Sequence, residues 1–176
     1  SPEDKTYMTV TTPFYGASEE LQLMEMSIDI SEQKKFEESL AVREKQFRTI
    51  FEESPLGVAL IDSLTGHIFE VNRKFADITG RSLSEMATID WMSITHPDDI
   101  QEDLDNMAVL NSGKINSFNM EKRYIKPDGS HVWINMTISP LKVEDKNSPR
   151  HLCMIEDINE KKRIEKDLTR FGRLLN

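Results

Sequence analysis

The hydrophobic pattern in the middle of the chain changes its period several times. Residues 57–62 (GVALID) and 67–71 (HIFEV) are short strand-like runs on either side of the turn SLTG, which is the pattern of a β-hairpin. Three longer strand-like runs occupy residues 116–126, 131–143 and 151–158, with the turn sequences PDGS and DKNSP between them. Because helical patterns separate the two groups of strands, the order predicts an α+β domain with an antiparallel sheet.

The helical insert has three parts. Residues 72–80 predict a short helix that Gly80 ends, residues 82–95 predict short helical turns, and residues 96–113 predict a longer helix with a proline in its first turn. The apolar face expected for the longer helix comprises Ile100, Leu104, Met107, Val109 and Leu110. Four acidic residues are expected on the opposite, solvated side, which argues against a catalytic carboxylate cluster: Asp99, Glu102, Asp103 and Asp105.

One phrase occurs twice in the chain. DISEQKKFEESL at residues 29–40 matches DINEKKRIEKDL at residues 157–168, so that Asp29 aligns with Asp157 and Leu40 aligns with Leu168. Each copy has an N-cap residue type, Ser31 or Asn159, followed by Glu, so each predicts the start of a capped helix. A repeat at this spacing indicates domain-sized units.

Both of these predicted helices are amphipathic. In the downstream helix the apolar residues are spaced four, three and four apart, as in a coiled-coil seam: Ile164, Leu168, Phe171 and Leu175. The upstream helix carries Phe36, Leu40, Phe47 and Ile50, with Arg43 at one seam position. Fewer than three heptads are present, so two interpretations stay open: a parallel homodimer through the linker helices, and surface helices packing on their own domain.

The repeat extends upstream of the helices. MTVT at residues 8–11 matches MTIS at residues 136–139, and Met26 matches Met154, both at the same spacing as the repeated phrase. Residues 6–30 are therefore interpreted as the last two strands of a preceding copy. Such strands would have unpaired edges that invite pairing with another chain, and a hairpin packed on the following helix is the alternative.

Composition narrows the functional classes. The formal net charge is −9 and basic residues are interleaved with acidic ones, so no nucleic-acid partner is expected. No apolar run approaches the roughly 20 residues that span a bilayer, and no signal peptide is visible, so no membrane contact within this chain is expected. The single cysteine, Cys153, fits a reducing compartment, and we expect a cytoplasmic location.

Five stretches between residues 44 and 162 resemble, in order, a PAS domain with its C-terminal linker: FRTIFEESPLGVALID, VNRKFADITG, HPDD, EKRYIKPDGSHVWINMTISPL and MIEDINEKK. The resemblance implies a PAS fold, in which a five-stranded antiparallel sheet carries short helices on one face and amphipathic linker helices flank it. It divides the chain into a tail of a preceding PAS-like unit (1–30), a linker helix (31–53), the PAS domain (54–158) and a C-terminal coiled-coil signalling helix (159–176). It also implies a bacterial multi-PAS sensory protein, a histidine kinase or a diguanylate cyclase. The sequence has no nucleophile elbow, phosphate-binding glycine loop or metal-ligand set, so no enzymatic activity is expected for this fragment.

The repeated phrase marks the joint between modules. Asp157, Ile158 and Asn159 match the family's Asp-Ile-Thr junction between the last strand and the output helix, with Asn in place of the usual Thr. The Asp157 carboxylate either caps the helix or pairs with a basic group on the domain. Because a helix start placed at the edge of a sheet couples movements of the two, this junction is a candidate signalling site.

A cofactor has little support in the sequence. In haem-binding PAS proteins the iron ligand lies within the longer helix, whereas His96 stands at its very beginning and suits a capping role. No two histidines have metal-ligand spacing, and Cys153 has no partner cysteine, which argues against a metal. The region where light-sensing PAS domains carry a reactive cysteine has none here, which argues against covalent flavin. Trp91 and Trp133 are aromatic residues that suit core packing or stacking on a ring.

A small organic ligand is compatible with the sequence. Methionines supply adaptable packing suited to a pocket, and the same residues also suit a closed core. The apolar cavity candidates are Phe75, Ile78, Met92, Met107, Phe118 and Met120, and the polar ones are Asn72, Arg123 and Asn135. Arg123 alternatively pairs with Asp157 or Glu121. Two functions follow: a sensor whose ligand state biases the C-terminal helix, or a ligand-free dimerisation and relay module.

Overall fold

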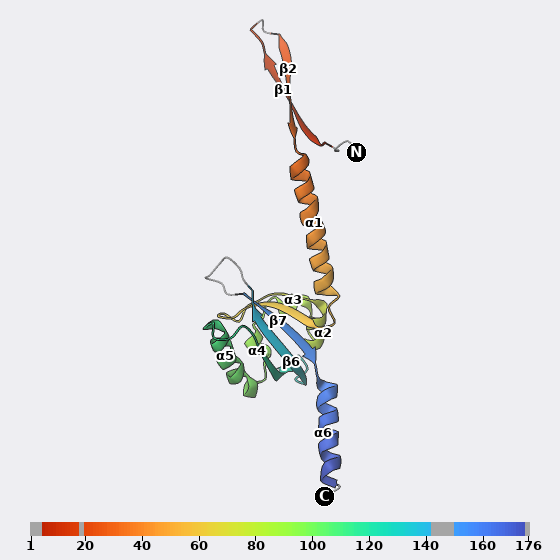
Figure 1. The fold of residues 1–176 in the computed structure, drawn as a ribbon, viewed down its shortest axis with the longest axis vertical. Helices are drawn as coiled ribbons and strands as arrows, with labels where there is room; N and C mark the ends of the chain where they lie inside the picture. Colours follow the sequence, from red (N-terminus) through yellow and green to blue (C-terminus); the bar gives the residue numbers. More distant parts are fainter. Residues whose placement is uncertain (1–4, 18–19, 142–149, 175–176) are drawn as a thin grey trace. The chain divides into compact units, whose positions relative to one another are not determined.

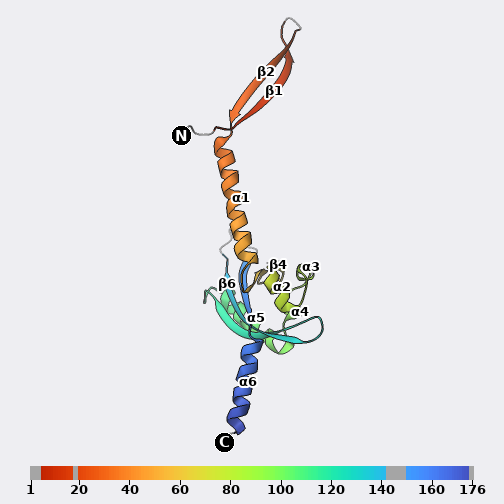
Figure 2. The same cartoon turned by 90° about the vertical axis from the view of Figure 1, so that its right-hand side faces the viewer.

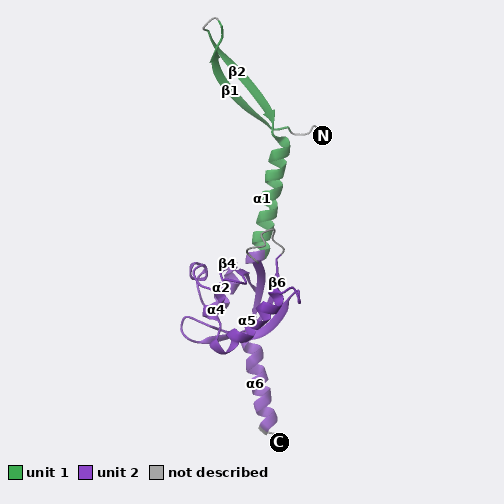
Figure 3. Cartoon of the chain, turned by 90° about the vertical axis from the view of Figure 1, so that its left-hand side faces the viewer, with its two compact units in different colours: residues 1–50 green, residues 51–176 purple. Residues whose placement is uncertain are grey.

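The computed structural model describes residues 5–17, 20–141 and 150–174. The chain divides into two compact units, Ser1–Ile50 and Phe51–Asn176 (Figure 3). None of the helices in these described ranges is both long enough and apolar enough to cross a membrane.

The second unit is built on a five-stranded antiparallel sheet. Its strands are β3 (Gly57–Asp62), β4 (Ile68–Val71), β5 (Phe118–Ile125), β6 (His131–Pro140) and β7 (Arg150–Asp157). Their order in the sheet is β4-β3-β7-β6-β5, so the strand that leads to the C-terminal helix is central. The helices α2 (Arg73–Thr79), α3 (Leu83–Met86), α4 (Trp91–Ile94) and α5 (Pro97–Asn111) lie between β4 and β5 in the chain and beside one face of the sheet (Figures 1 and 2). The predicted α+β class and the five-stranded sheet are confirmed.

Alternation decides which strand residues face the helices. In β6, Val132, Ile134, Met136 and Ile138 are buried and the residues between them are not. In β3, Gly57 brings the strand close to α2, because a Cβ at this position would lie 2.9 Å from the Cα of Phe75. The core therefore sits between the sheet and the short helices.

The buried face of α5 agrees only in part with the predicted one. Its buried residues are Asp103, Met107 and Leu110, whereas Leu104 is 37% exposed and Val109 is 40% exposed. Asp103, expected on the solvated side, is fully buried. The prediction was right for Met107 and Leu110 and wrong for Asp103, because the hydrophobic pattern counts a carboxylate as a solvated group, whereas a buried partner on β5 stabilises this one.

The first unit contains a hairpin and a helix. Strands β1 (Tyr7–Tyr15) and β2 (Leu21–Asp29) pair with each other, and α1 (Ser31–Glu52) follows. All residues of both strands are exposed, so the hairpin is not packed on the helix, which corrects that alternative.

The register of the hairpin corrects the sequence alignment of the repeat. Asp29 faces Tyr7, whereas Asp157 faces Ile134, so Tyr7 is the counterpart of Ile134 and Met8 is the counterpart of Asn135. In this alignment Pro13 of β1 coincides with Pro140 of β6. The match of MTVT to MTIS was wrong by one residue, since the loops that join the strands differ in length.

Candidate functional site

The start of the C-terminal helix α6 (Asn159–Leu174) is bonded to the central strands through the backbone of Trp133. The Ile158 N–H donates to the Trp133 carbonyl at 2.9 Å, and the Trp133 N–H donates to Asn159 Oδ1 at 3.0 Å. The Asn159 N–H donates to Asp157 Oδ1 at 2.9 Å. The three predicted junction residues thus come together, and the carboxylate of Asp157 accepts a backbone N–H at the start of the helix.

A second set of contacts holds the first turn of α6 to β5. Lys161 Nζ lies 2.8 Å from Glu121 Oε1, and Lys162 Nζ bonds the other oxygen of the same carboxylate. Hydrogen bonds from Lys161 and then Lys162 lower the pKa of Glu121. Lys162 Nζ also lies 5.0 Å from the centre of the Trp133 ring, in cation–π range.

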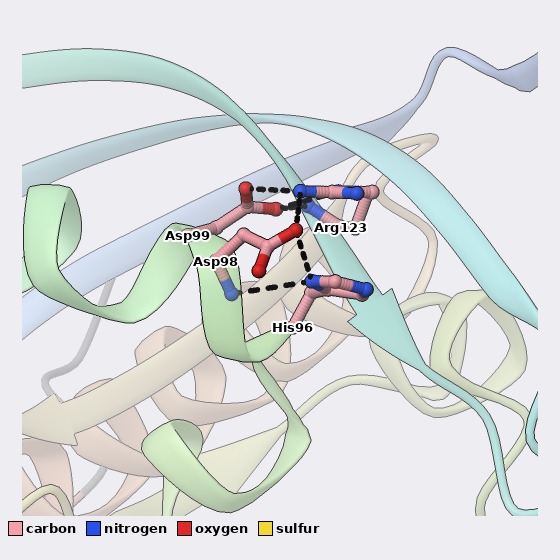
Figure 4. Close-up of polar contacts among 4 residues, drawn as sticks. All are labelled: His96, Asp98, Asp99 and Arg123. Carbon is pink, nitrogen blue, oxygen red and sulfur yellow. Dashed lines mark hydrogen bonds and ion pairs between the residues drawn. The ribbon is translucent and has the colours of Figure 1, made fainter.

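His96, Asp98 and Asp99 at the start of α5 form a polar cluster with Arg123 of β5 (Figure 4). Arg123 binds Asp99 in a bidentate way, with Nε 3.0 Å from Oδ2 and Nη2 2.7 Å from Oδ1. Burial opposes ionisation of Asp99, but the hydrogen bonds from Arg123 prevail and lower the pKa of this carboxyl. The Asp98 carboxylate lies 3.4 Å from Arg123 Nη2, and the Arg123 guanidinium lies 5.2 Å from the centre of the Trp133 ring. Arg123 therefore pairs with α5, not with Asp157 or Glu121, which corrects that expectation.

The Trp133 ring consequently has two cations from different elements within cation–π range. Arg123 belongs to β5 and is held by α5, while Lys162 belongs to α6. The backbone of Trp133 in turn bonds Ile158 and Asn159, so the contacts of this residue reach both β5 and the start of α6. Trp133 was named in the sequence only as a possible packing or stacking residue, and its position at this junction is visible only in the structure.

The inner face of β5 carries a buried ion pair. Lys122 and Asp103 side chains are each 1% exposed, and Lys122 Nζ bonds Asp103 Oδ2. Lys122 Nζ also donates to Thr95 Oγ1 at 3.3 Å and lies 4.7 Å from the Tyr124 ring centre. Within the described residues, Asp103 Oδ1 and the Nε1–H of Trp91 are buried and have no hydrogen-bond partner.

The apolar cavity candidates lie in or against the core. Phe75, Ile78, Met107 and Met120 are members of the buried cluster, and Met92 and Phe118 pack against it. These side chains pack between the sheet and the helices.

The polar candidates lie elsewhere. Asn72 is fully buried, but its Oδ1 accepts from Val58 and Phe75 N–H groups and its Nδ2 donates to the Phe51 and Leu56 carbonyls. All four bonds are to backbone, so Asn72 is occupied in holding the fold. Alternation along β5 and β6 places Arg123 and Asn135 on the face opposite the core, away from the six apolar candidates.

The histidines and the cysteine occupy capping, exposed or buried positions. His96 caps α5 by accepting the Asp98 N–H at 3.3 Å, as its place at the helix start suggests. His67 and His131 are exposed, whereas His151 is buried. Burial raises the pKa of the Cys153 thiol to about 12, so it is inert at neutral pH. Among the described residues no three His, Cys, Asp or Glu side chains gather as a metal site would require.

Comparison with known proteins gives the family. A model of the PAS fold matches residues 68–155, half of the chain, and the chain belongs to this family. The match and the five-stranded sheet identify a PAS sensor domain, similar to those of a probable diguanylate cyclase and a sensor histidine kinase described next.

Two curated relatives are longer proteins. The chain is 34% identical over 122 residues to "Probable diguanylate cyclase DgcE" of Escherichia coli (strain K12), which covers 69% of this chain and 11% of that protein. It is 25% identical over 130 residues to "Sensor histidine kinase TmoS" of Ectopseudomonas mendocina, covering 74% of this chain and 13% of that protein. The chain thus spans a small part of either relative.

Solved structures share the fold. The PAS domain of an HTR-like protein from Haloarcula marismortui superposes with a TM-score of 0.60 at 22% identity, covering 71% of this chain and 99% of that one. A sensory box histidine kinase/response regulator from Burkholderia thailandensis E264 gives 0.57 at 22% identity, covering 74% and 97%.

Proposed function

We propose that this chain is a sensory relay module in which a change on the helical side of the PAS domain reaches an output domain through α6. The observation that carries the proposal is the position of Trp133, whose backbone bonds Ile158 and Asn159 and whose ring contacts Arg123 and Lys162. Since Arg123 is held by Asp99 of α5, one continuous set of contacts joins α5 to the first turn of α6. In longer proteins the output domain is a histidine kinase or a diguanylate cyclase, by analogy with the two relatives.

The module acts as a parallel homodimer through its linker helices. On α6 the seam residues Ile164, Leu168 and Phe171 are 49%, 67% and 65% exposed, while Leu175 lies outside the described residues. On α1, Phe36, Leu40, Phe47 and Ile50 are also exposed. Apolar side chains at this spacing are stabilised when a second helix covers them.

Leu168→Asp is expected to weaken the dimer on the order of 100-fold in dissociation constant, because a carboxylate would be buried in an apolar seam. Sedimentation velocity over a range of concentrations measures the change. Lys166→Asp is the matched control, since Lys166 lies off the seam and its substitution should leave the dimer intact. An unchanged sedimentation profile for Leu168→Asp would refute the seam.

The contacts of Glu121 predict that the stability of the first turn of α6 depends on pH. Because Lys161 and Lys162 lower the pKa of Glu121 in the folded chain, its stabilising contribution is present above the ordinary carboxyl pKa of 4.5 and is lost as pH falls through the lowered folded value. Glu121→Gln should therefore reduce the hydrogen-exchange protection of the first turn of α6 at pH 7, and the difference from wild type should vanish in acid. Glu156→Gln, an exposed carboxyl on β7, is the control. Equal protection of the Glu121 variant and wild type at pH 7 would contradict the role of these ion pairs.

A second candidate is a ligand sensor. The buried Asp103 Oδ1 and Trp91 Nε1 lack partners among the described residues, and they suit a small, neutral polar molecule that both donates and accepts hydrogen bonds. Native mass spectrometry and an absorption spectrum of one sample distinguish the candidates, because a bound mass supports the sensor. A bare dimer that no compound stabilises in a thermal-shift screen supports the relay.

A further inference from the structure

The hairpin and the start of α1 repeat the hydrogen bonds of the PAS–α6 junction. The Ile30 N–H donates to the Thr6 carbonyl at 2.9 Å, and the Thr6 N–H donates to Ser31 Oγ at 2.8 Å. The Ser31 N–H donates to Asp29 Oδ1 at 2.9 Å. These four residues occupy the same roles as Ile158, Trp133, Asn159 and Asp157.

The two strand pairs also agree further from the helix. Pro13 faces Leu23 in the hairpin, and Pro140 faces His151 in the PAS sheet, which are the same rungs of the two ladders. On the last strands, Met24 and Met26 occupy the positions of Leu152 and Met154, which are half-buried on the outer face of β7. The similarity therefore includes the junction, the register and the apolar residues of the outer face, whereas Glu25 and Ser27 stand at the positions of the buried Cys153 and Ile155.

The two pairs differ in what lies along their edges. In the PAS sheet, β7 is covered by β3 and β6 is covered by β5. In the hairpin, β1 and β2 have only each other as neighbours within the described residues. Since Ile30 donates to Thr6, the antiparallel alternation directs the N–H groups of Thr9, Thr11, Glu25 and Ser27 outward, along the two open edges.

We propose that β1 and β2 are the last two strands of a second PAS-type sheet, and that the strands which cover their edges come from the polypeptide preceding residue 1. A counterpart of β3 would pair antiparallel with β2, and a counterpart of β5 would pair antiparallel with β1. In the PAS sheet Gly57 of β3 faces Ile155, which corresponds to Ser27, so the β3 counterpart would have its first residue opposite Ser27. The relatives, of which this chain spans 11% and 13%, have room for such a unit.

This inference goes beyond the proposed relay and does not depend on it. It identifies α1 as the output helix of the preceding sheet, because α1 begins with the same capped junction as α6.

Hydrogen exchange of individual amides tests the proposal. The comparison is between this chain and the natural polypeptide extended upstream by a segment as long as residues 57–130. In the extended protein, the outward amides of Thr9, Thr11, Glu25 and Ser27 should exchange on the order of 100-fold more slowly than in this chain. Cys153 and Ile155, which occupy the positions of Glu25 and Ser27 in β7, serve as internal references that should not change.

Unchanged exchange of the four outward amides in the extended protein would overturn the proposal. Protection already present in the shorter chain and rising with protein concentration would also overturn it, because a second copy would then be the occupant of the edges.

A proline variant gives an independent readout. Glu25→Pro removes an outward N–H, so it should leave the hairpin of the shorter chain paired but lower the melting temperature of the upstream unit in the extended protein. Glu25→Ala keeps the N–H and is the matched control. Equal melting temperatures of the two variants in the extended protein would contradict pairing along the β2 edge.

Discussion

Replacing Asp103 with alanine should lower the free energy of unfolding of the PAS unit by about 3–5 kcal/mol, because Lys122 would keep a buried charge without its partner. Lys122 and Asp103 are each 1% exposed, so water does not take the place of the lost carboxylate. Both tryptophans, Trp91 and Trp133, belong to this unit, so denaturant unfolding followed by tryptophan fluorescence reports on it specifically.

A double variant separates the loss of the pair from the loss of the aspartate. Lys122→Met combined with Asp103→Leu removes both charges at similar volume, and its stability should lie within about 1 kcal/mol of wild type or above it. If the free energy of unfolding of Asp103→Ala equals that of wild type, the ion pair does not hold α5 on the sheet. If the double variant is as unstable as the single one, packing and not charge is what Asp103 contributes.

Asn72→Ala should destabilise the PAS unit by about 3 kcal/mol or more, since each buried backbone group left without a partner costs about 1–3 kcal/mol. The side chain bonds two N–H groups, of Val58 and Phe75, and two carbonyls, of Phe51 and Leu56. It thereby joins the start of β3, the start of α2 and the end of α1. The same fluorescence-detected unfolding measures the loss.

Asn135→Ala is the matched control for this experiment. Asn135 has the same chemistry but lies half-exposed on the outer face of β6, and its loss should cost no more than about 0.5 kcal/mol. Equal destabilisation by the two variants would show that the four bonds of Asn72 contribute little.

Local sequence patterns predicted the fold well. Strand periodicity, the glycine that ends α2, and the proline in the first turn of α5 all depend on interactions between neighbouring residues, and the structure has these elements where they were expected. The junction at Asp157, Ile158 and Asn159 was predictable for the same reason, because a cap joins residues that are adjacent in sequence.

Polar residues were harder to place. Lys122 and Arg123 are neighbours in sequence, yet alternation sends Lys122 into the core and Arg123 outward. Their partners, Asp103 and Asp99, are one helical turn apart on α5, so the sequence shows two acids and two bases without showing which pair is buried. The repeat presented a similar difficulty. A shift of a single position in the alignment of β1 with β6 moves every side chain to the other face of the sheet. Only the register of the paired strands distinguishes the alignment read from the sequence from the one that the structure has.

Spacing along the chain was enough to predict the elements, their order, the repeated junction and the amphipathic helices. The buried charges, the contacts of Trp133 with Arg123 and Lys162, and the four backbone bonds of Asn72 are visible only in the folded chain. These features depend on residues that are distant in sequence and meet only when the sheet forms, and burial there gives a single ion pair or hydrogen bond an energy that no local pattern reveals.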